Sequence, residues 1–270
     1  MTAIAPARVS VGGSSPLRTA LMYLGPVATV VALILVWQVW VTAAGIKPFV
    51  LPTPTAVWST FIERPSFFVG LGLNTLREAL LGLVIGCAAG TVTALSVFRI
   101  RGLSRIAEAV AAALLALPMV ALVPLSNVFF GLTASSRIFV VAVAVYPIAV
   151  SFLIDGLRDT DRGLIDAFRS MSLSPMKTIL ALYVPSMLPS AMSALRVAVP
   201  TAFSIAIVAE FFGGELTTLG TFIKSTAVQS RVADMWGAAL VAFLFALVLY
   251  LALSLIDRWA LRWHTSRTPS

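Results

Sequence analysis

Charged residues are scarce in this sequence: Asp, Glu, Lys and Arg together make up 11% of its 270 residues, whereas hydrophobic residues make up 59%. A soluble globular chain contains about 25% charged residues. A soluble protein of this length could not cover its surface with so few charges. The same numbers exclude a disordered chain, a collagen-like repeat and a coiled coil. The composition therefore predicts an integral membrane protein.

Several chemistries lack the residue types that they require. The single cysteine, Cys87, cannot form an internal disulfide. The single histidine, His264, lies in a charged C-terminal segment, which excludes histidine-based metal sites and catalytic triads. A phosphate-binding loop requires Gly-Lys-Ser/Thr, but the three lysines follow Ile46, Met176 and Ile223. We therefore expect no catalytic residue, metal site or cofactor in this chain, and any ATP hydrolysis must come from a partner.

Six apolar runs are long enough to cross a bilayer, which takes about 20 mostly apolar residues. They cover residues 19–44, 73–98, 106–130, 137–156, 186–212 and 236–257. Pro118 and Pro124 interrupt the third run and predict a bent or broken span, because proline breaks the helical hydrogen-bond ladder. We therefore expect a six-span, all-α membrane domain over residues 19–260, a disordered tail over residues 1–18 and a second tail over residues 261–270.

The lysines and arginines predict the orientation of this domain, since cytoplasmic loops carry an excess of them. With the N-terminus inside, 12 of the 19 lie in cytoplasmic segments: Arg8, Arg18, Arg99, Arg101, Arg105, Arg158, Arg162, Arg169, Lys177, Arg258, Arg262 and Arg267. The outer side has Lys47, Arg64, Arg77, Arg137, Lys224 and Arg231. This bias predicts that both termini are cytoplasmic, and it attributes the net charge of +8 to topology rather than to nucleic-acid binding. Arg77 and Glu78 are then expected to be interfacial anchors.

The long cytoplasmic segment, residues 157–185, has the pattern of two short helices separated by a turn near Ser172. Thr160 or Asp161 can cap the first helix, because their side-chain oxygens accept hydrogen bonds from free backbone N–H groups. Ser174 followed by Pro175 is typical of the start of a second helix.

The first of these short helices carries an apolar ridge, since Leu164, Phe168 and Met171 recur at i, i+4 and i+7. The segment is too short and too polar on its other face to span the bilayer. One possibility is that the ridge lies among the lipid headgroups, where basic amphipathic helices bind. Four acidic residues dilute the basic face and favour a protein partner instead: Asp155, Asp159, Asp161 and Asp166.

The same segment resembles the EAA loop of ABC-transporter permease subunits. The resemblance covers residues 165–175 and 183–189. Asp166, Ala167 and Phe168 stand at the Glu-Ala-Ala positions, Ser172 at the glycine and Pro185 at the proline. In that family the loop is a coupling helix that inserts into a groove of the cytoplasmic ATPase subunit. Aspartate shortens the acidic arm, and serine enters positive φ less easily than the glycine that it replaces.

Five further segments, in order along the chain, resemble the permeases for nitrate, sulfonates and taurine. They are Pro52–Trp58, Ala116–Pro124 with Phe129–Leu132, Leu195–Arg196, Val208–Glu210 and Gly220–Ile223. The resemblance covers residues 30–260. It implies the type I ABC importer (MetI-like) permease fold, with six transmembrane helices and a cytoplasmic coupling-helix loop. The coupling residues that it implies are Leu164, Asp166, Ala167, Phe168, Met171, Ser172, Pro175 and Pro185.

The family also implies partners and a location. Two ABC ATPase subunits would hold ATP and Mg, an extracytoplasmic binding protein would deliver the substrate, and a second permease copy would complete a homodimer in the lipid of the bacterial plasma membrane. The substrate would be a small solute such as nitrate, a sulfonate, taurine or a vitamin precursor. Two other functions remain open, a stand-alone secondary transporter and an intramembrane enzyme. Both need a set of intramembrane polar residues, and few are available.

Four residues within the apolar runs are candidates for the translocation pathway: Asn127, Arg196, Pro200 and Glu210. Placing an ionisable residue inside a bilayer costs free energy, so Arg196 and Glu210 either anchor the structure or take part in transport. Asn127 is more typical of hydrogen bonding between helices. Separately, Gly82, Gly86 and Gly90 form a stripe that suits close helix packing, either within the subunit or between two copies.

Overall fold

The computed structural model describes residues 16–171, 173–214 and 216–260, and every regular element in these ranges is helical. The helices are α1 (Pro16–Ala43), α2 (Pro54–Glu63), α3 (Pro65–Val97), α4 (Arg101–Leu115), α5 (Met119–Phe130), α6 (Ala134–Arg158), α7 (Arg162–Ser170), α8 (Pro175–Thr178), a π-helical turn η1 (Ile179–Tyr183), α9 (Val184–Phe211), α10 (Leu219–Val228) and α11 (Val232–Ala260). The predicted turn at Ser172 and most of the two predicted tails lie outside the described residues.

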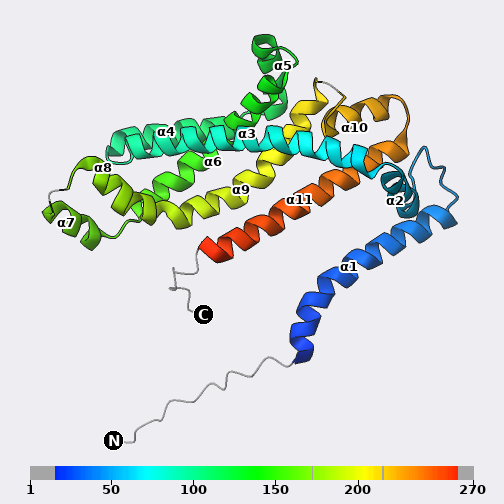
Figure 1. Cartoon of the computed structure of the whole chain (residues 1–270), viewed down its shortest axis with the longest axis horizontal. Helices are drawn as coiled ribbons and strands as arrows, with labels where there is room; N and C mark the ends of the chain where they lie inside the picture. The colour runs from blue at the N-terminus through cyan, green and yellow to red at the C-terminus, as the bar shows by residue number, and fades with distance from the viewer. Residues whose placement is uncertain (1–15, 172, 215, 261–270) are drawn as a thin grey trace, which may run out of the picture.

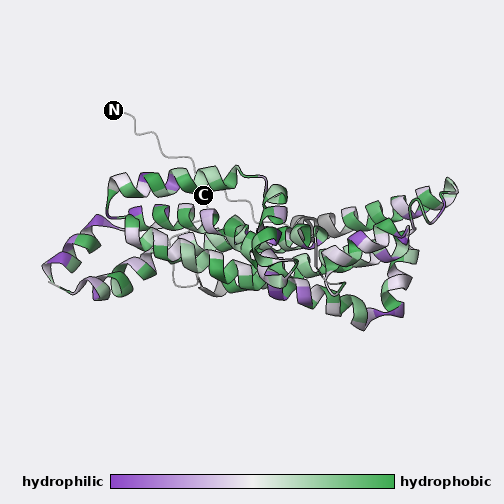
Figure 2. Ribbon diagram, turned by 90° about the horizontal axis from the view of Figure 1, so that it is seen from above, coloured by the Kyte–Doolittle hydropathy of each residue, from purple (hydrophilic) through white to green (hydrophobic). Residues whose placement is uncertain are grey.

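Four helical stretches are long and apolar enough to cross a membrane: Pro65–Val97, Ala134–Arg158, Pro175–Phe211 and Val232–Asp257. They correspond to the second, fourth, fifth and sixth predicted spans. Figure 1 shows them running along one long axis, with α7 and α8 at one end and α2 and α10 at the other. Hydrophobic residues cover most of these helices, whereas hydrophilic residues stand out in α7 (Figure 2). This distribution is that of a protein whose solvent is largely lipid.

The third predicted span is broken, as its prolines indicate. Helices α4 and α5 meet at an angle of 95°, and together they count as a fifth span. The break falls at Pro118, which directly precedes α5 and which keeps Leu117 out of the helical conformation. Pro124 lies inside α5 without ending it. In α1 the apolar part Ala28–Ala43 is shorter than a full span, so the first predicted span, residues 19–44, remains a prediction.

The predicted loop of residues 157–185 is shorter in the structure than the sequence suggested. Helix α8, the π-helical turn and α9 form one continuous stretch of 37 residues, Pro175–Phe211, instead of a short helix followed by a separate span. The π-helical turn ends two residues before Pro185, which has no N–H to donate to the helical ladder. Between α6 and α8, the described residues outside helices are 159–161, 171, 173 and 174, on the two sides of α7.

The core of the bundle is the contact of α3 with α6 and α9. A Cβ atom added at Gly82 would lie 2.5 Å from Val141 Cβ, and one added at Gly90 would lie 2.5 Å from Ala149 Cβ. At Gly86 the added atom would lie 2.7 Å from the carbonyl oxygen of Ala142. The glycine stripe is thus filled by α6 of the same chain. Of the two possibilities, packing within the subunit is confirmed for these glycines.

Helix α1 stands apart from the bundle, and α5 projects from one side of it (Figure 1). Helix α1 contacts the rest of the chain near its C-terminal end, where the rings of Trp37 and Trp236 lie 5.0 Å apart. On α5, Val128 and Phe129 are almost fully exposed. Such surfaces suit contact with acyl chains or with another membrane protein.

Candidate functional site

Helix α7, the first candidate site, begins where the sequence predicted. Asp161 is its N-cap, and the Asp161 side chain accepts a hydrogen bond from the backbone N–H of Leu164 at 3.0 Å. Thr160, the other candidate cap, is buried, and its hydroxyl has no hydrogen-bond partner among the described residues. Helix α7 projects from the end of the bundle (Figure 1).

The predicted ridge on α7 does not form one surface. Leu164 is 50% exposed and Met171 is 65% exposed, so both are free to meet a partner. Phe168 instead turns partly inward and packs with Ile165 against the buried cluster that contains Tyr183. The reason is that the bundle lies on one flank of α7. Phe168 therefore fastens α7 to the body of the permease, and the outward apolar surface is narrower than the sequence suggested.

The other predicted coupling residues of the described chain are exposed. Asp166 and Arg169 lie 3.4 Å apart at 73% and 77% side-chain exposure, so their ion pair contributes little. Ala167 and Pro175 are also exposed, the latter at the start of α8. Pro185 is exposed too, but it lies inside the continuous helical stretch rather than in a loop.

Glu210, the second candidate site, is completely buried near the end of α9. Its Oε2 atom accepts hydrogen bonds from the hydroxyl of Thr75 at 3.1 Å and from the backbone N–H of Gly220 at 2.7 Å. The Thr75 hydroxyl also accepts a bond from the N–H of Leu219 at 3.0 Å. These bonds join α3, α9 and α10. They favour an anchoring role for Glu210 over a mobile one.

The remaining pathway candidates make contacts of their own. Arg196 forms an ion pair with Asp257 of α11, a carboxylate partner of the kind that its position in a span requires. Asn127 accepts a hydrogen bond from the Ser136 hydroxyl at 2.6 Å and so ties α5 to α6. Pro200 is exposed on α9. The three polar candidates among the four therefore each have a different partner.

An ion pair that the sequence interpretation missed lies near the α10 end. Glu78 and Arg137 were expected at the membrane surface, as an interfacial anchor and as part of an outer loop. They are instead 7% and 5% exposed. Arg137 donates to both carboxylate oxygens of Glu78, from Nε at 2.6 Å and from Nη2 at 2.5 Å. Arg137 also reaches the carbonyl oxygen of Gly213 at 3.3 Å. The sequence gives no signal for this pair, because its members are 59 positions apart.

Among the described residues, no group of three or more His, Cys, Asp or Glu side chains could hold a metal ion. The buried polar groups at the α10 end are engaged in bonds between helices. These bonds hold α3, α6, α9 and α10 against one another.

Comparison with known proteins shows the family of this chain. Residues 82–266 match the family of binding-protein-dependent transport system inner membrane components. The chain belongs to this family. It is therefore a multi-pass membrane permease of an ABC importer, and such permease subunits are non-catalytic. This membership decides against a stand-alone transporter and against an intramembrane enzyme.

The relatives match over nearly their full lengths. The putative aliphatic sulfonates transport permease of Escherichia coli K12 is 30% identical over 259 residues, which are 93% of this chain and 96% of the relative. A probable ABC transporter permease of Haemophilus influenzae is 28% identical, over 85% of this chain and 94% of its own. The formylaminopyrimidine transport permease of Halalkalibacterium halodurans is 27% identical, over 89% of this chain and 96% of the relative.

A solved structure of the methionine ABC transporter, in inward-facing conformations, shares the fold of this chain. The TM-score is 0.61 at 19% sequence identity, over 73% of this chain and 98% of the other. A solved amino acid ABC transporter aligns with a TM-score of 0.59 at 19% identity, over 74% of this chain and 97% of the other. At these identities the likeness concerns the fold alone.

Proposed function

We propose that this permease forms one half of the translocation pathway of an importer whose partners are two ATPase subunits, an extracytoplasmic binding protein and a second copy of the same chain. The ATPase subunits would bind ATP and Mg. The observation that carries the proposal is α7, which projects from the bundle with Leu164 and Met171 exposed. A groove on an ATPase subunit would bury both side chains, and burial of each contributes roughly 1.5–3 kcal/mol.

The structure offers a physical route for coupling. Phe168 and Ile165 of α7 pack against the cluster that contains Leu182 and Tyr183 of the π-helical turn. That turn is continuous with α9, which spans the membrane. A displacement of α7 by an ATPase subunit would therefore move a spanning helix directly. The coupled movement of two copies would open the pathway to one side of the membrane at a time.

The proposed substrate class follows from the relatives. Their names specify transport of aliphatic sulfonates, taurine, bicarbonate, formylaminopyrimidine and riboflavin. We place the substrate among small solutes of this range, which extends from sulfonate-like and nitrate-like anions to vitamin precursors. The binding protein would select among them. Ligand identification on the cognate binding protein, by mass spectrometry of the purified complex, tests this assignment.

The coupling role is tested with Leu164→Asp, with Leu164→Met as the matched conservative variant. Loss of one buried apolar side chain predicts an association with the ATPase that is weaker by roughly tenfold to a hundredfold. The measurements are copurification of the ATPase and substrate-stimulated ATP hydrolysis in reconstituted membranes. The variant should remain inserted and monodisperse, since Leu164 is exposed. Normal coupled transport by Leu164→Asp would refute the docking role of α7.

The proposed topology has six spans within residues 19–260 and both termini in the cytoplasm, with α4 and α5 together as the third span. It rests on the excess of arginine and lysine in alternate segments. Reporter fusions after residues 60 and 225 should report the outer side, and a fusion after residue 165 should report the cytoplasm. An outer-side signal at residue 165 would contradict the topology.

A further inference from the structure

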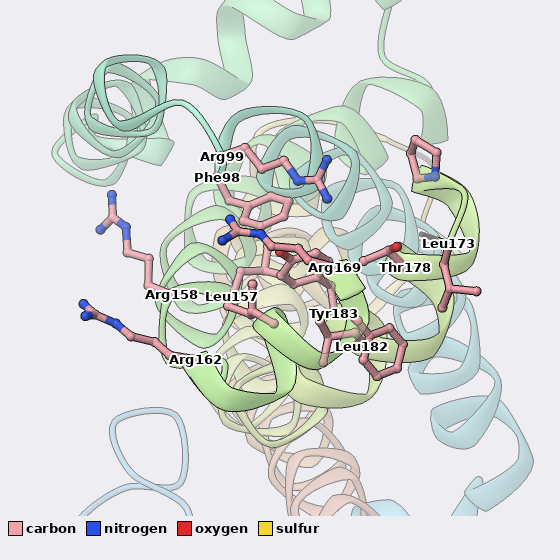
Figure 3. A pocket seen from close by; sticks show the side chains of 13 residues that line it. Phe98, Arg99, Leu157, Arg158, Arg162, Arg169, Leu173, Thr178, Leu182 and Tyr183 are labelled. Carbon is pink, nitrogen blue, oxygen red and sulfur yellow. The ribbon is translucent and has the colours of Figure 1, made fainter. Parts of the chain in front are cut away.

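A cavity of about 890 Å³ separates α7 from the body of the permease. The turn between α3 and α4, the end of α6, α7 and the π-helical turn surround it (Figure 3). Leu157, Leu182 and Tyr183, all buried, form its apolar wall. The coupling proposal uses the contacts of Phe168 beside this cavity but gives the cavity itself no occupant.

The cavity is lined by four arginines and by no acidic residue: Arg99, Arg158, Arg162 and Arg169. Arg158 is neutralised by Glu108, whose Oε1 lies 2.5 Å from Nη1. Arg169 has only the exposed pairing with Asp166. Within the described ranges, neither Arg99 nor Arg162 has a carboxylate at salt-bridge distance. The lining therefore has an uncompensated positive charge.

Two of these arginines face the cavity together. Figure 3 shows the guanidinium groups of Arg99 and Arg169 on either side of the Phe98 ring, whereas Arg158 and Arg162 point away toward the rim. Arg99 is held by ring contacts, with its Cζ 5.8 Å from the centre of Phe98 and 5.6 Å from that of Tyr183. Two like charges over one cavity repel each other. An anionic group in the cavity would reduce that repulsion, and the planar guanidinium fork suits phosphate oxygens.

The surroundings favour a phospholipid over free phosphate as the source of that oxyanion. Ile100, Leu103 and Ile106, on the turn after Arg99 and the first part of α4, have exposed side chains. An acyl chain would cover these side chains, whereas a free phosphate ion would leave them exposed. Basic pockets between helices at the cytoplasmic surface attract anionic headgroups.

We propose that Arg99 and Arg169 bind an anionic phospholipid headgroup in this cavity, with the acyl chains lying along Ile100, Leu103 and Ile106. The bound headgroup would brace α7 against the body at the base of the coupling loop. The proposal goes beyond the transport function, and it rests on that function only for the cytoplasmic location of α7.

The experiment uses the full-length permease in nanodiscs and in mixed micelles, without the ATPase, so that its outcome does not depend on coupling. Native mass spectrometry and lipid titration compare phosphatidylglycerol with phosphatidylcholine. The test variant is Arg99→Gln with Arg169→Gln. The control, Arg105→Gln with Lys177→Gln, removes the same charge from exposed residues that do not line the cavity. A third variant, with lysine at positions 99 and 169, retains the charge and checks folding.

At about 1 kcal/mol for each basic residue, the test variant should bind phosphatidylglycerol roughly thirtyfold more weakly, while the control variant retains most of its affinity. Equal losses in the two variants would overturn the proposal, because they would show a diffuse surface charge. Binding of inorganic phosphate that depends on Arg99 and Arg169 without any preference for phosphatidylglycerol would assign the site to a free oxyanion and also overturn it. Phosphatidylglycerol binding that is unchanged in the test variant would likewise overturn the proposal.

Discussion

The buried ion pair of Glu78 and Arg137 allows a sharp test of what holds the α10 end together. Replacing Glu78 with Gln removes the carboxylate but keeps the shape of the side chain. Arg137, at 5% exposure, is then left buried without its counter-charge. Only its bond to the carbonyl oxygen of Gly213, at 3.3 Å, and its other contacts remain. Breaking one partner of a buried pair costs about 3–5 kcal/mol.

The double variant Glu78→Gln with Arg137→Met separates the pair from its surroundings. Desolvation of two charges offsets most of their attraction, so removing both should cost far less than removing one, on the order of 1 kcal/mol or less. The exposed pair of Arg64 and Asp234, at the same end of the bundle, supplies the control. Because the Arg64 side chain is 44% exposed, Arg64→Gln should cost no more than about 1 kcal/mol.

The measurement is the free energy of unfolding in mixed detergent micelles, obtained from denaturant titration of helical circular dichroism. The expected loss of stability is large for Glu78→Gln and small for both the double variant and Arg64→Gln. Losses that simply add, so that the double variant is less stable than Glu78→Gln, would refute the reasoning. So would a loss below about 1 kcal/mol for Glu78→Gln, since it would mean that water reaches Arg137.

Three further predictions concern single positions, all measured as the free energy of unfolding. Gly86→Ala should destabilise the protein by about 1–3 kcal/mol, because the added Cβ would lie 2.7 Å from the Ala142 carbonyl oxygen. The control is Gly70→Ala in the same helix, whose Cβ meets nothing within 4 Å and which should stabilise by about 0.5–1 kcal/mol. Similar values for the two variants would contradict the packing of α3 on α6. Ser230→Gly should stabilise by about 1 kcal/mol, since Ser230 has a φ of 57° just after α10, and a loss would exclude strain there. Glu210→Ala should cost about 1–3 kcal/mol by leaving the buried N–H of Gly220 unpaired, and a neutral result would show that water replaces the carboxylate.

Features that depend on neighbours along the chain could be predicted from the sequence. The break of the third span follows from Pro118, because proline restricts the residue before it whatever surrounds the helix. The cap of α7 follows from Asp161, whose side chain reaches an N–H only three residues away. The four confirmed spans follow from runs of apolar residues that only lipid or protein can cover.

The start of the fifth span shows that neighbouring residues alone do not determine where a helix begins. The apolar run of residues 186–212 predicted a span that begins just after Pro185, yet the helical stretch starts at Pro175. A π-helical turn just before Pro185 maintains the helical path, and no pattern in the sequence announces that turn. Likewise the spacing of Leu164, Phe168 and Met171 places them on one ridge, but only the position of the bundle decides that Phe168 turns inward.

By itself the sequence determined that this chain is a membrane protein, where four of its spans lie and to which family it belongs, because composition, apolar run length and motif order are local properties. The tertiary structure alone decided which charges meet. Glu78 reaches Arg137 across 59 positions, Glu210 reaches Thr75 across 135, and Arg99 faces the same cavity as Arg169. Such contacts depend on how α3, α6, α7, α9 and α10 pack, and a buried charge reveals its partner only after the helices are in place.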